Sequence, residues 1–144
     1  MVQLSESLAI LERKGAVYTL RSAYNLLGGL SMMQADYDQA VYYMKKGVEV
    51  SQEMGDLRSV AASLNNLGEI RREQGDYESA VEIYREGVVV ARKIDNRLVE
   101  TTLLSNLGGA QIGSGDFQGA EKNLRRAIAL AQDAGHGGLS ETYR

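Results

Sequence analysis

The sequence predicts an all-α, right-handed solenoid of antiparallel helix pairs, and two observations lead to that fold class. The first is a repeat: the pair Leu27-Gly28 recurs as Leu67-Gly68 and as Leu107-Gly108, each 40 residues after the last. The second is that apolar residues within each repeat recur every three or four positions, which is the spacing of one helix face. Self-similarity at such a period is typical of solenoids rather than of closed globular domains.

The chain is predicted to begin with part of a repeat. Residues 1–15 place Leu4, Leu8 and Leu11 on helical spacing. They align with the second helix of a repeat whose first helix is absent. Gly15 aligns with Gly55 one period later, so we expect this helix to end there and a turn to follow.

Repeat one is predicted over residues 17–56, with helices at 17–35 and 37–54. Ala35 stands at the turn between them, where the other repeats have glycine. If Ala35 is left-handed, that conformation costs roughly 1–2 kcal/mol relative to glycine. Asp36 is then expected to cap the second helix, and Gln39 completes a capping-box pattern.

Repeat two is predicted over residues 57–96, with helices at 57–74 and 77–94. Gly75 is expected to take the left-handed conformation that ends a helix, and Asp76 to cap the next one. Gly68 and Ala80 lack bulk where the two helices come closest. The larger side chains of Leu67, Tyr77 and Tyr84 are therefore expected to interlock around them as ridges in grooves.

Repeat three is predicted over residues 97–136, with helices at 97–114 and 117–134, and residues 137–144 would begin a further helix after a loop from Gly135. Each helix of about 18 residues is about 27 Å long. Helix pairs in a solenoid bury their apolar faces only by stacking on neighbours, and neither end carries a polar cap. Either the chain is part of a longer array, or its ends stack on or swap with another copy. In both cases we expect self-association through residues 1–14 or 137–144.

Composition argues for a soluble scaffold in the cytoplasm. The chain has 144 residues, is 44% hydrophobic, and carries a formal charge of −3 that is spread along its length. A nucleic-acid surface would need a clustered basic patch, so we expect none. Without cysteine there is no disulfide and no thiolate metal site. The first residues show neither a basic leader nor a long apolar run, which predicts no signal peptide and no membrane span.

Catalytic chemistry is not expected. His136 is the sole histidine, so neither a hydrolytic triad nor a multi-ligand zinc site can be assembled. Gly113, Gly115 and Gly119 superficially suggest a phosphate loop, but such a loop must follow a strand and open a helix. Here two of these glycines end a helix and the third lies inside the next. The sequence predicts no enzyme, no cofactor and no metal.

The residues resemble the tetratricopeptide repeat family, whose loose signature has a large residue, then Leu-Gly, then a small residue and an aromatic in the second helix. The middle repeat carries Leu64, Leu67, Gly68, Tyr77, Ala80, Tyr84 and Gly87 at these places, with Tyr24, Leu27, Gly28, Tyr37, Ala40, Met44 and Gly47 before it and Leu104, Leu107, Gly108, Phe117, Ala120, Leu124 and Ala127 after it. The period is 40 rather than 34. Together with the Asn-Leu-Gly run, it resembles the long-repeat branch found in kinesin light chains, spindle-orientation adaptors and bacterial signalling regulators.

The resemblance implies a concave groove that binds a segment of a protein partner. The groove residues it implies are Asn25, Leu26, Gly29, Met32, Met33, Asn65, Asn66, Glu69, Arg72, Ser105, Asn106, Gly109 and Ile112. Asparagine offers both a donor and an acceptor to a peptide backbone. Relatives that clamp a carboxylate use lysine, arginine and asparagine at set groove positions, and Asn66 fits one of the asparagine positions. The other positions hold Asn25, Gly29, Thr102 and Asn106, so the cations are missing and a carboxylate clamp is not expected.

Two classes of function remain open on the sequence. The favoured one is a non-catalytic protein-interaction scaffold that holds a peptide or helix of a partner in its groove, as part of a larger regulatory or signalling protein. The alternative is a self-association module that has no peptide ligand.

Overall fold

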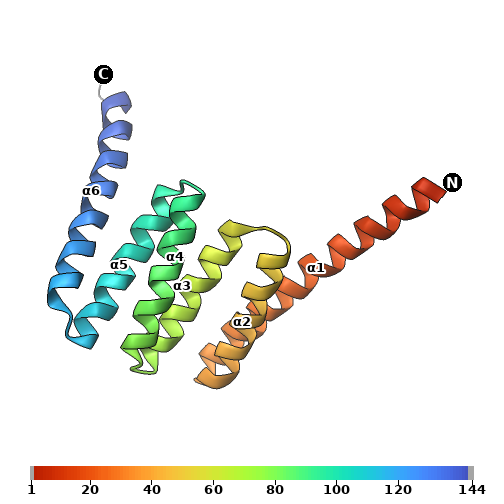
Figure 1. Cartoon of the computed structure of the whole chain (residues 1–144), viewed down its shortest axis with the longest axis horizontal. Helices are drawn as coiled ribbons and strands as arrows, with labels where there is room; N and C mark the ends of the chain where they lie inside the picture. The colour runs from red at the N-terminus through yellow and green to blue at the C-terminus, as the bar shows by residue number, and fades with distance from the viewer. Residues whose placement is uncertain (1, 143–144) are drawn as a thin grey trace.

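The computed structural model describes the backbone of residues 2–142 and the side chains of residues 6–10 and 12–134. This part of the chain forms six helices joined by short turns: α1 (Val2–Met33), α2 (Tyr37–Glu53), α3 (Leu57–Glu73), α4 (Tyr77–Lys93), α5 (Arg97–Ser114) and α6 (Phe117–Thr142). Successive helices run antiparallel and stack side by side along the chain (Figure 1). The fold is the predicted α-solenoid of helix pairs.

The turns follow the predicted chemistry. Gly75 is left-handed with φ +78°, and the Asp76 carboxylate accepts a hydrogen bond from the Ser79 backbone N–H at 3.2 Å. Ala35 is also left-handed, with φ 57°, so the cost of roughly 1–2 kcal/mol relative to glycine applies to it. Only half of the predicted capping box forms, because the backbone N–H of Asp36 donates to the Ser31 carbonyl instead.

Asp56 caps α3 and also ties it to α1. Its carboxylate accepts from the Ser59 N–H at 3.1 Å and the Ser59 hydroxyl at 2.8 Å, and Arg21 donates to it at 2.6 Å. The Ser59 hydrogen bonds, side-chain first, lower the pKa of Asp56, and Arg21 lowers it further.

We expect Asp56→Ala to lower the free energy of unfolding by about 1 kcal/mol at neutral pH, the usual worth of a helix cap. A carboxyl whose pKa is depressed in the folded state stabilises above its unfolded pKa and loses that contribution as pH falls. The difference between parent and variant, measured by urea unfolding, should therefore shrink below pH 4. A difference that stays constant down to pH 3 would contradict this account of the cap.

The two terminal helices differ from the prediction. Residues 1–15 were expected to form a separate helix ending at Gly15, and 137–144 to begin another after a loop at Gly135. Instead α1 runs without a break from Val2 to Met33, and α6 from Phe117 to Thr142. The turns inside the array are each followed by an aspartate or asparagine cap, whereas Ala16 and His136 occupy those positions here. Without a capping side chain the helix simply continues. Met1, Tyr143 and Arg144 lie outside the described residues.

Small residues sit where paired helices approach most closely, as predicted. A Cβ on Gly68 would fall on the ring of Tyr84, and one on Gly108 would lie 2.6 Å from Leu124 Cγ. At Gly28 the equivalent contact is with Met44 Cε, at 2.7 Å. The glycine at this repeat position therefore makes room for a different large side chain in each repeat.

The core runs along the array as linked clusters. The largest joins α3 to α6 and includes Tyr84, Leu103, Leu104 and Leu107, and two smaller ones join α2 to α3. One charged group enters the α4/α5 junction: the nearly buried Glu100 accepts from Arg92 Nε at 2.8 Å, and Arg126 of α6 lies 3.7 Å away. Within the part of the chain that the structure describes, no helix has the length and apolar character needed to cross a bilayer.

Candidate peptide-binding groove

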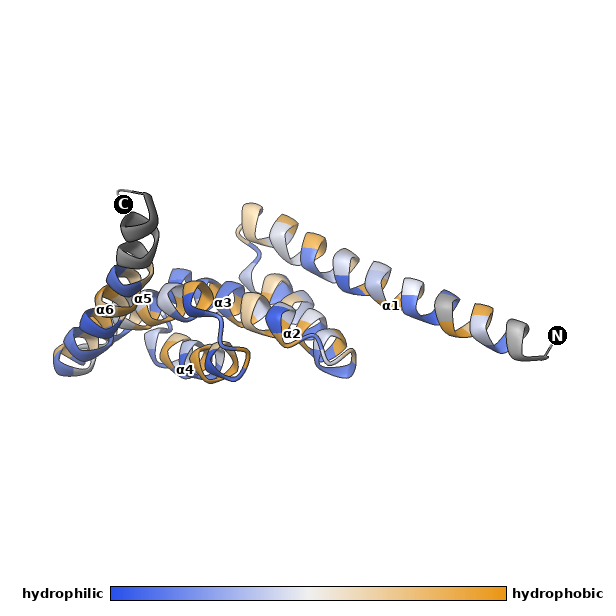
Figure 2. Cartoon of the chain, turned by 90° about the horizontal axis from the view of Figure 1, so that it is seen from above, coloured by the Kyte–Doolittle hydropathy of each residue, from blue (hydrophilic) through white to orange (hydrophobic). Residues whose placement is uncertain are grey.

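The first helices of the pairs form one layer of the solenoid. Figure 2 shows α3 and α5 in one layer and α4 in the other. The first-layer helices also touch each other directly, because Asn106 Nδ2 of α5 donates to Asn65 Oδ1 of α3 at 2.7 Å. The helices α3 and α5 contact each other although α4 lies between them in the chain. In a curved array, such contacts form on the concave side, where neighbouring repeats are closest. The predicted groove residues, all on α1, α3 and α5, therefore share this inner layer.

On α1 the predicted residues divide into two groups. Leu26 and Met33 are among the most exposed apolar side chains of the described chain, at 74% and 88%. Gly29 leaves open space, since a Cβ there would meet nothing within 4 Å. Met32, by contrast, packs against the core cluster of α2 and α3. Met32 was predicted in the groove and is better described as a packing residue.

Asn25 also turns away from the groove. Its Oδ1 points at Gly47 of α2, where an added Cβ would lie 2.7 Å from it, and it is buried without a hydrogen-bond partner. Gly47 thus makes room for an amide rather than for an apolar ridge. The sequence treated Asn25 as equivalent to Asn65 one period later, and the structure gives the two amides different surroundings.

On α3 and α5 the amides form a linked pair. Asn65 and Asn106 are half-buried and bonded to each other, while Asn66 and Ser105 are exposed. Asn106 was predicted to line the groove, and its side chain also links two repeats. Asn66 alone among these amides is exposed to solvent as predicted.

A hollow of about 490 Å³ opens between the end of α3 and the second half of α5. It is lined by Arg72, Glu73, Tyr77, Gly109, Ile112 and Gly113. Two glycines let the neighbouring side chains line it closely. A Cβ on Gly109 would lie 3.2 Å from Arg72 Nη1, and one on Gly113 would fall on the ring of Tyr77. The hollow therefore combines an aromatic ring, an exposed isoleucine and one charge of each sign.

Sequence reasoning missed part of this hollow. Tyr77 was assigned to helix packing rather than to the groove, yet it lines this hollow. The 40-residue period contains a signal for this hollow, because Met33, Glu73 and Gly113 occupy the same position in three successive repeats. A glycine among bulkier residues at one aligned position indicates a local opening.

Tyr84 of α4 is fully buried, with its ring against Gly68 of α3. Burial raises the pKa of its phenol to about 12, with Arg72 opposing and Glu69 adding to the shift. Its hydroxyl has no hydrogen-bond partner. Among the residues with described side chains, no group of acidic residues or histidines could hold a metal ion.

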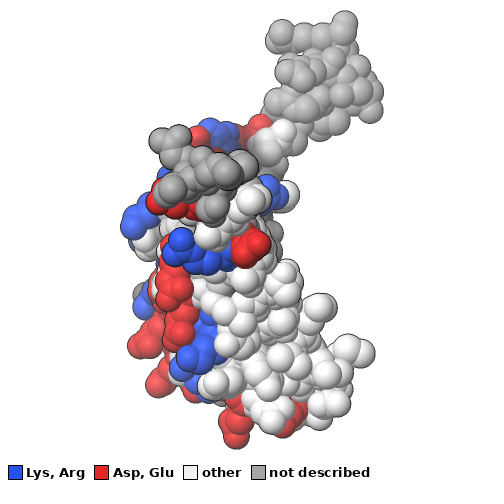
Figure 3. All heavy atoms as spheres, turned by 90° about the vertical axis from the view of Figure 1, so that its right-hand side faces the viewer, with Lys and Arg blue, Asp and Glu red and all other residues white. Residues whose placement is uncertain are grey.

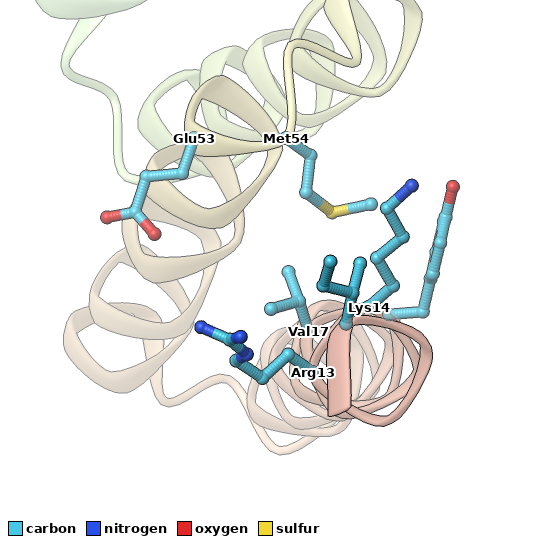
Figure 4. A pocket seen from close by; sticks show the side chains of 7 residues that line it. Arg13, Lys14, Val17, Glu53 and Met54 are labelled. Carbon is cyan, nitrogen blue, oxygen red and sulfur yellow. The ribbon is translucent and has the colours of Figure 1, made fainter. Parts of the chain in front are cut away.

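A second hollow, of about 600 Å³, lies where α1 runs past the end of α2. Figure 4 shows Arg13, Lys14 and Val17 of α1 facing Glu53 and Met54 across it. It exists because α1 continues straight at Gly15 instead of turning. Its charges are mixed, and none of its residues belongs to the predicted groove.

Comparison with protein families matches a model described as "Tetratricopeptide repeat" at residues 18–93 and again at 59–133. The two matches together run from residue 18 to residue 133. Comparison with curated proteins finds no match.

Solved structures share the fold at low sequence identity. The tetratricopeptide domain of FLU from Arabidopsis is 16% identical with a TM-score of 0.75, covering 81% of this chain and 98% of that one. Aspartyl phosphate phosphatase F from Bacillus subtilis is 16% identical with a TM-score of 0.76, covering 80% and 30%. The N-terminal domain of stress-induced protein-1 from C. elegans is 20% identical with a TM-score of 0.70, covering 80% and 87%. These likenesses concern the fold.

Proposed function

Because the chain belongs to the tetratricopeptide repeat family, we propose that it is a non-catalytic scaffold that holds a segment of a partner protein along the inner layer of α1, α3 and α5. Tetratricopeptide repeat domains are generally protein-interaction modules. The observation that carries the proposal is the exposure of Leu26, Met33 and Ile112 on this layer. Exposed apolar side chains grouped beside polar ones are typical of binding surfaces.

The polar groups of the layer suit a peptide backbone. In the Asn65–Asn106 pair one donor and one acceptor satisfy each other, which leaves the remaining amide hydrogens and the Asn106 oxygen for a ligand. The hollow beside Arg72 and Tyr77 would take one side chain of the bound segment. The exposed apolar side chains of this layer, with asparagine amides between them, favour binding of an amphipathic segment over a strongly acidic one.

The test begins with the full chain immobilised and panned against a library of random dodecapeptides. The selected peptides are synthesised, and their dissociation constants are measured by fluorescence anisotropy for the parent and for Asn66→Ala/Asn106→Ala. Removing two hydrogen-bonding side chains at about 1 kcal/mol each should weaken binding by tenfold or more. The double variant should remain helical, with a stability loss near 1 kcal/mol from the missing Asn65–Asn106 bond.

The matched control is Glu82→Ala/Glu86→Ala, which changes two exposed side chains on α4, a helix of the other layer. It should bind the peptides as the parent does. If the groove double variant binds them with the parent's affinity, the groove is assigned to the wrong face.

A further inference from the structure

Residues that the repeat buries inside the array are exposed on its two terminal helices. Leu27 of α1 is 39% exposed, whereas its equivalents Leu67 and Leu107 are 4% and 3% exposed. Leu30 is 49% exposed, against 1% for Ile70 one repeat later. On α6, Ile128 is 57% exposed, while Val48 and Val88 are 9% and 4% exposed. Each terminal helix thus presents a face that another helix covers elsewhere in the same chain.

The junction between α2 and α3 shows what covers such faces. Val48 of α2 packs with Val60 and Leu64 of α3, and Met44 of α2 packs with Leu67. By the 40-residue period α6 corresponds to α2, and α1 corresponds to α3. The outer face of α6 is therefore one half of this junction, and the outer face of α1 is the other half.

We infer that two copies of this chain associate head to tail, with α6 of one copy packed on α1 of the next in the register of the internal junctions. In that register Ile128 packs against Leu20 of a second copy, and Leu124 packs against its Leu27. Ile112, Phe117, Leu124 and Ile128 already border a shallow hollow of about 510 Å³ on α6. This inference concerns the ends of the solenoid and goes beyond the proposed groove.

The lengths of the terminal helices agree with this arrangement. In the α4/α5 junction Gly87 lies against Leu103, where an added Cβ would meet the leucine at 2.9 Å. The same register places Ala127 opposite Ala23 of the next copy, so residues 135–142 of α6 run antiparallel beside residues 8–15 of that copy's α1. Figure 1 shows that the start of α1 and the end of α6 both point upward, away from the α1/α2 and α5/α6 turns at the lower edge of the array. The two overlong helices, of 32 and 26 residues against 17 or 18 for the others, then continue one antiparallel pair.

The α1 end presents an uncharged surface that suits an apolar contact, whereas the α6 end carries a carboxylate that opposes it. Figure 3 looks at the α1 end of the molecule and shows charged side chains along one edge, with a broad uncharged surface beside them. On α6, Glu121 stands where Val41 and Val81 are buried. In the stacked register it faces Leu30 of the second copy. Desolvating this carboxylate costs free energy and therefore weakens the association.

The interface is heterologous, and a mixing experiment separates it from symmetric dimers. Sedimentation velocity is measured from 5 to 500 µM, roughly the range in which weak apolar interfaces associate, for the parent, Leu20→Asp and Ile128→Asp. The average mass of the parent should rise with concentration, and each variant alone should stay monomeric. An equimolar mixture of the two variants should form dimers that grow no further, because each variant supplies the face that the other lacks. Val89→Asp, at an equally exposed valine of α4, should behave as the parent does.

Every other outcome overturns the arrangement. Dimers of Ile128→Asp alone would indicate an α1–α1 contact, and dimers of Leu20→Asp alone an α6–α6 contact. A parent that stays monomeric throughout would show that the exposed end faces do not recognise each other. Circular dichroism melts confirm that each variant is folded before its mass is interpreted.

A gain-of-association variant tests the same register from the opposite direction. Glu121→Val restores the residue type that the internal junctions bury at this position. It should tighten the association by about tenfold, since burying one more apolar side chain contributes at least 1.4 kcal/mol. An unchanged dissociation constant would place Glu121 outside the contact.

Discussion

Replacing Gly68 with leucine is expected to lower the free energy of unfolding by about 1–3 kcal/mol, the usual cost of overpacking a core. A Cβ at this position would fall on the ring of Tyr84, which is fully buried and cannot move aside without displacing Leu103 and its neighbours. The two helices of the middle pair would have to separate. Urea unfolding followed by circular dichroism measures the loss.

Gly29→Leu is the matched control for this prediction. Gly29 lies on the equivalent helix of repeat one, but nothing stands within 4 Å of a Cβ built there. Because leucine favours the helix over glycine, this variant should be as stable as the parent or more stable by up to about 1 kcal/mol. If both variants lose the same stability, glycine at position 68 is not required by the contact with Tyr84.

Replacing Tyr84 with phenylalanine is expected to remove an alkaline weakness of the fold at no cost at neutral pH. The Tyr84 hydroxyl is buried and has no partner, so deleting it relieves an unsatisfied polar group and should leave stability unchanged or raise it by about 1 kcal/mol. Most buried tyrosines would lose a hydrogen bond in the same substitution.

The pH dependence follows from the direction of the pKa shift. Burial raises the pKa of Tyr84 from 10.0 to about 12 in the folded chain. A group whose folded pKa is raised contributes its full stability below the unfolded pKa and loses it as pH rises through the folded value. Between pH 10 and 12 the parent should therefore lose about 2–3 kcal/mol relative to the phenylalanine variant. Urea unfolding at pH 7, 10 and 11.5 provides the comparison, and parallel curves for the two proteins would contradict it.

Most of the fold could be predicted because its signals are local and repeated. The Leu-Gly pairs fixed the period, and Gly75 with Asp76 marked a turn that the structure contains. The ends could not be predicted from the period alone. Gly15 aligns with a turn glycine, yet a glycine stops a helix only where the chain gains a cap beyond it, and Ala16 offers none.

The groove could be predicted as a face but not as a set of contacts. Asn25 and Asn65 occupy the same repeat position, but one amide turns toward Gly47 and the other bonds to Asn106. Whether an amide faces the groove or its neighbour depends on the residue across the junction, which the spacing does not encode. For the same reason Tyr77 could be assigned to packing while it also borders the hollow beside Arg72.

The unequal core clusters have a consequence for cooperativity. The helices from α3 to α6 share one large cluster, reinforced by the contact of Glu100 with Arg92 and Arg126, whereas α2 joins α3 through two small clusters. In a linear array each link opens with its own free energy, so the chain is a series of unequal links rather than one all-or-none unit. The α1–α2 hairpin is the link most readily detached. A segment bound across α1 and α3 would bridge that link, so its binding energy would also close the weakest part of the array.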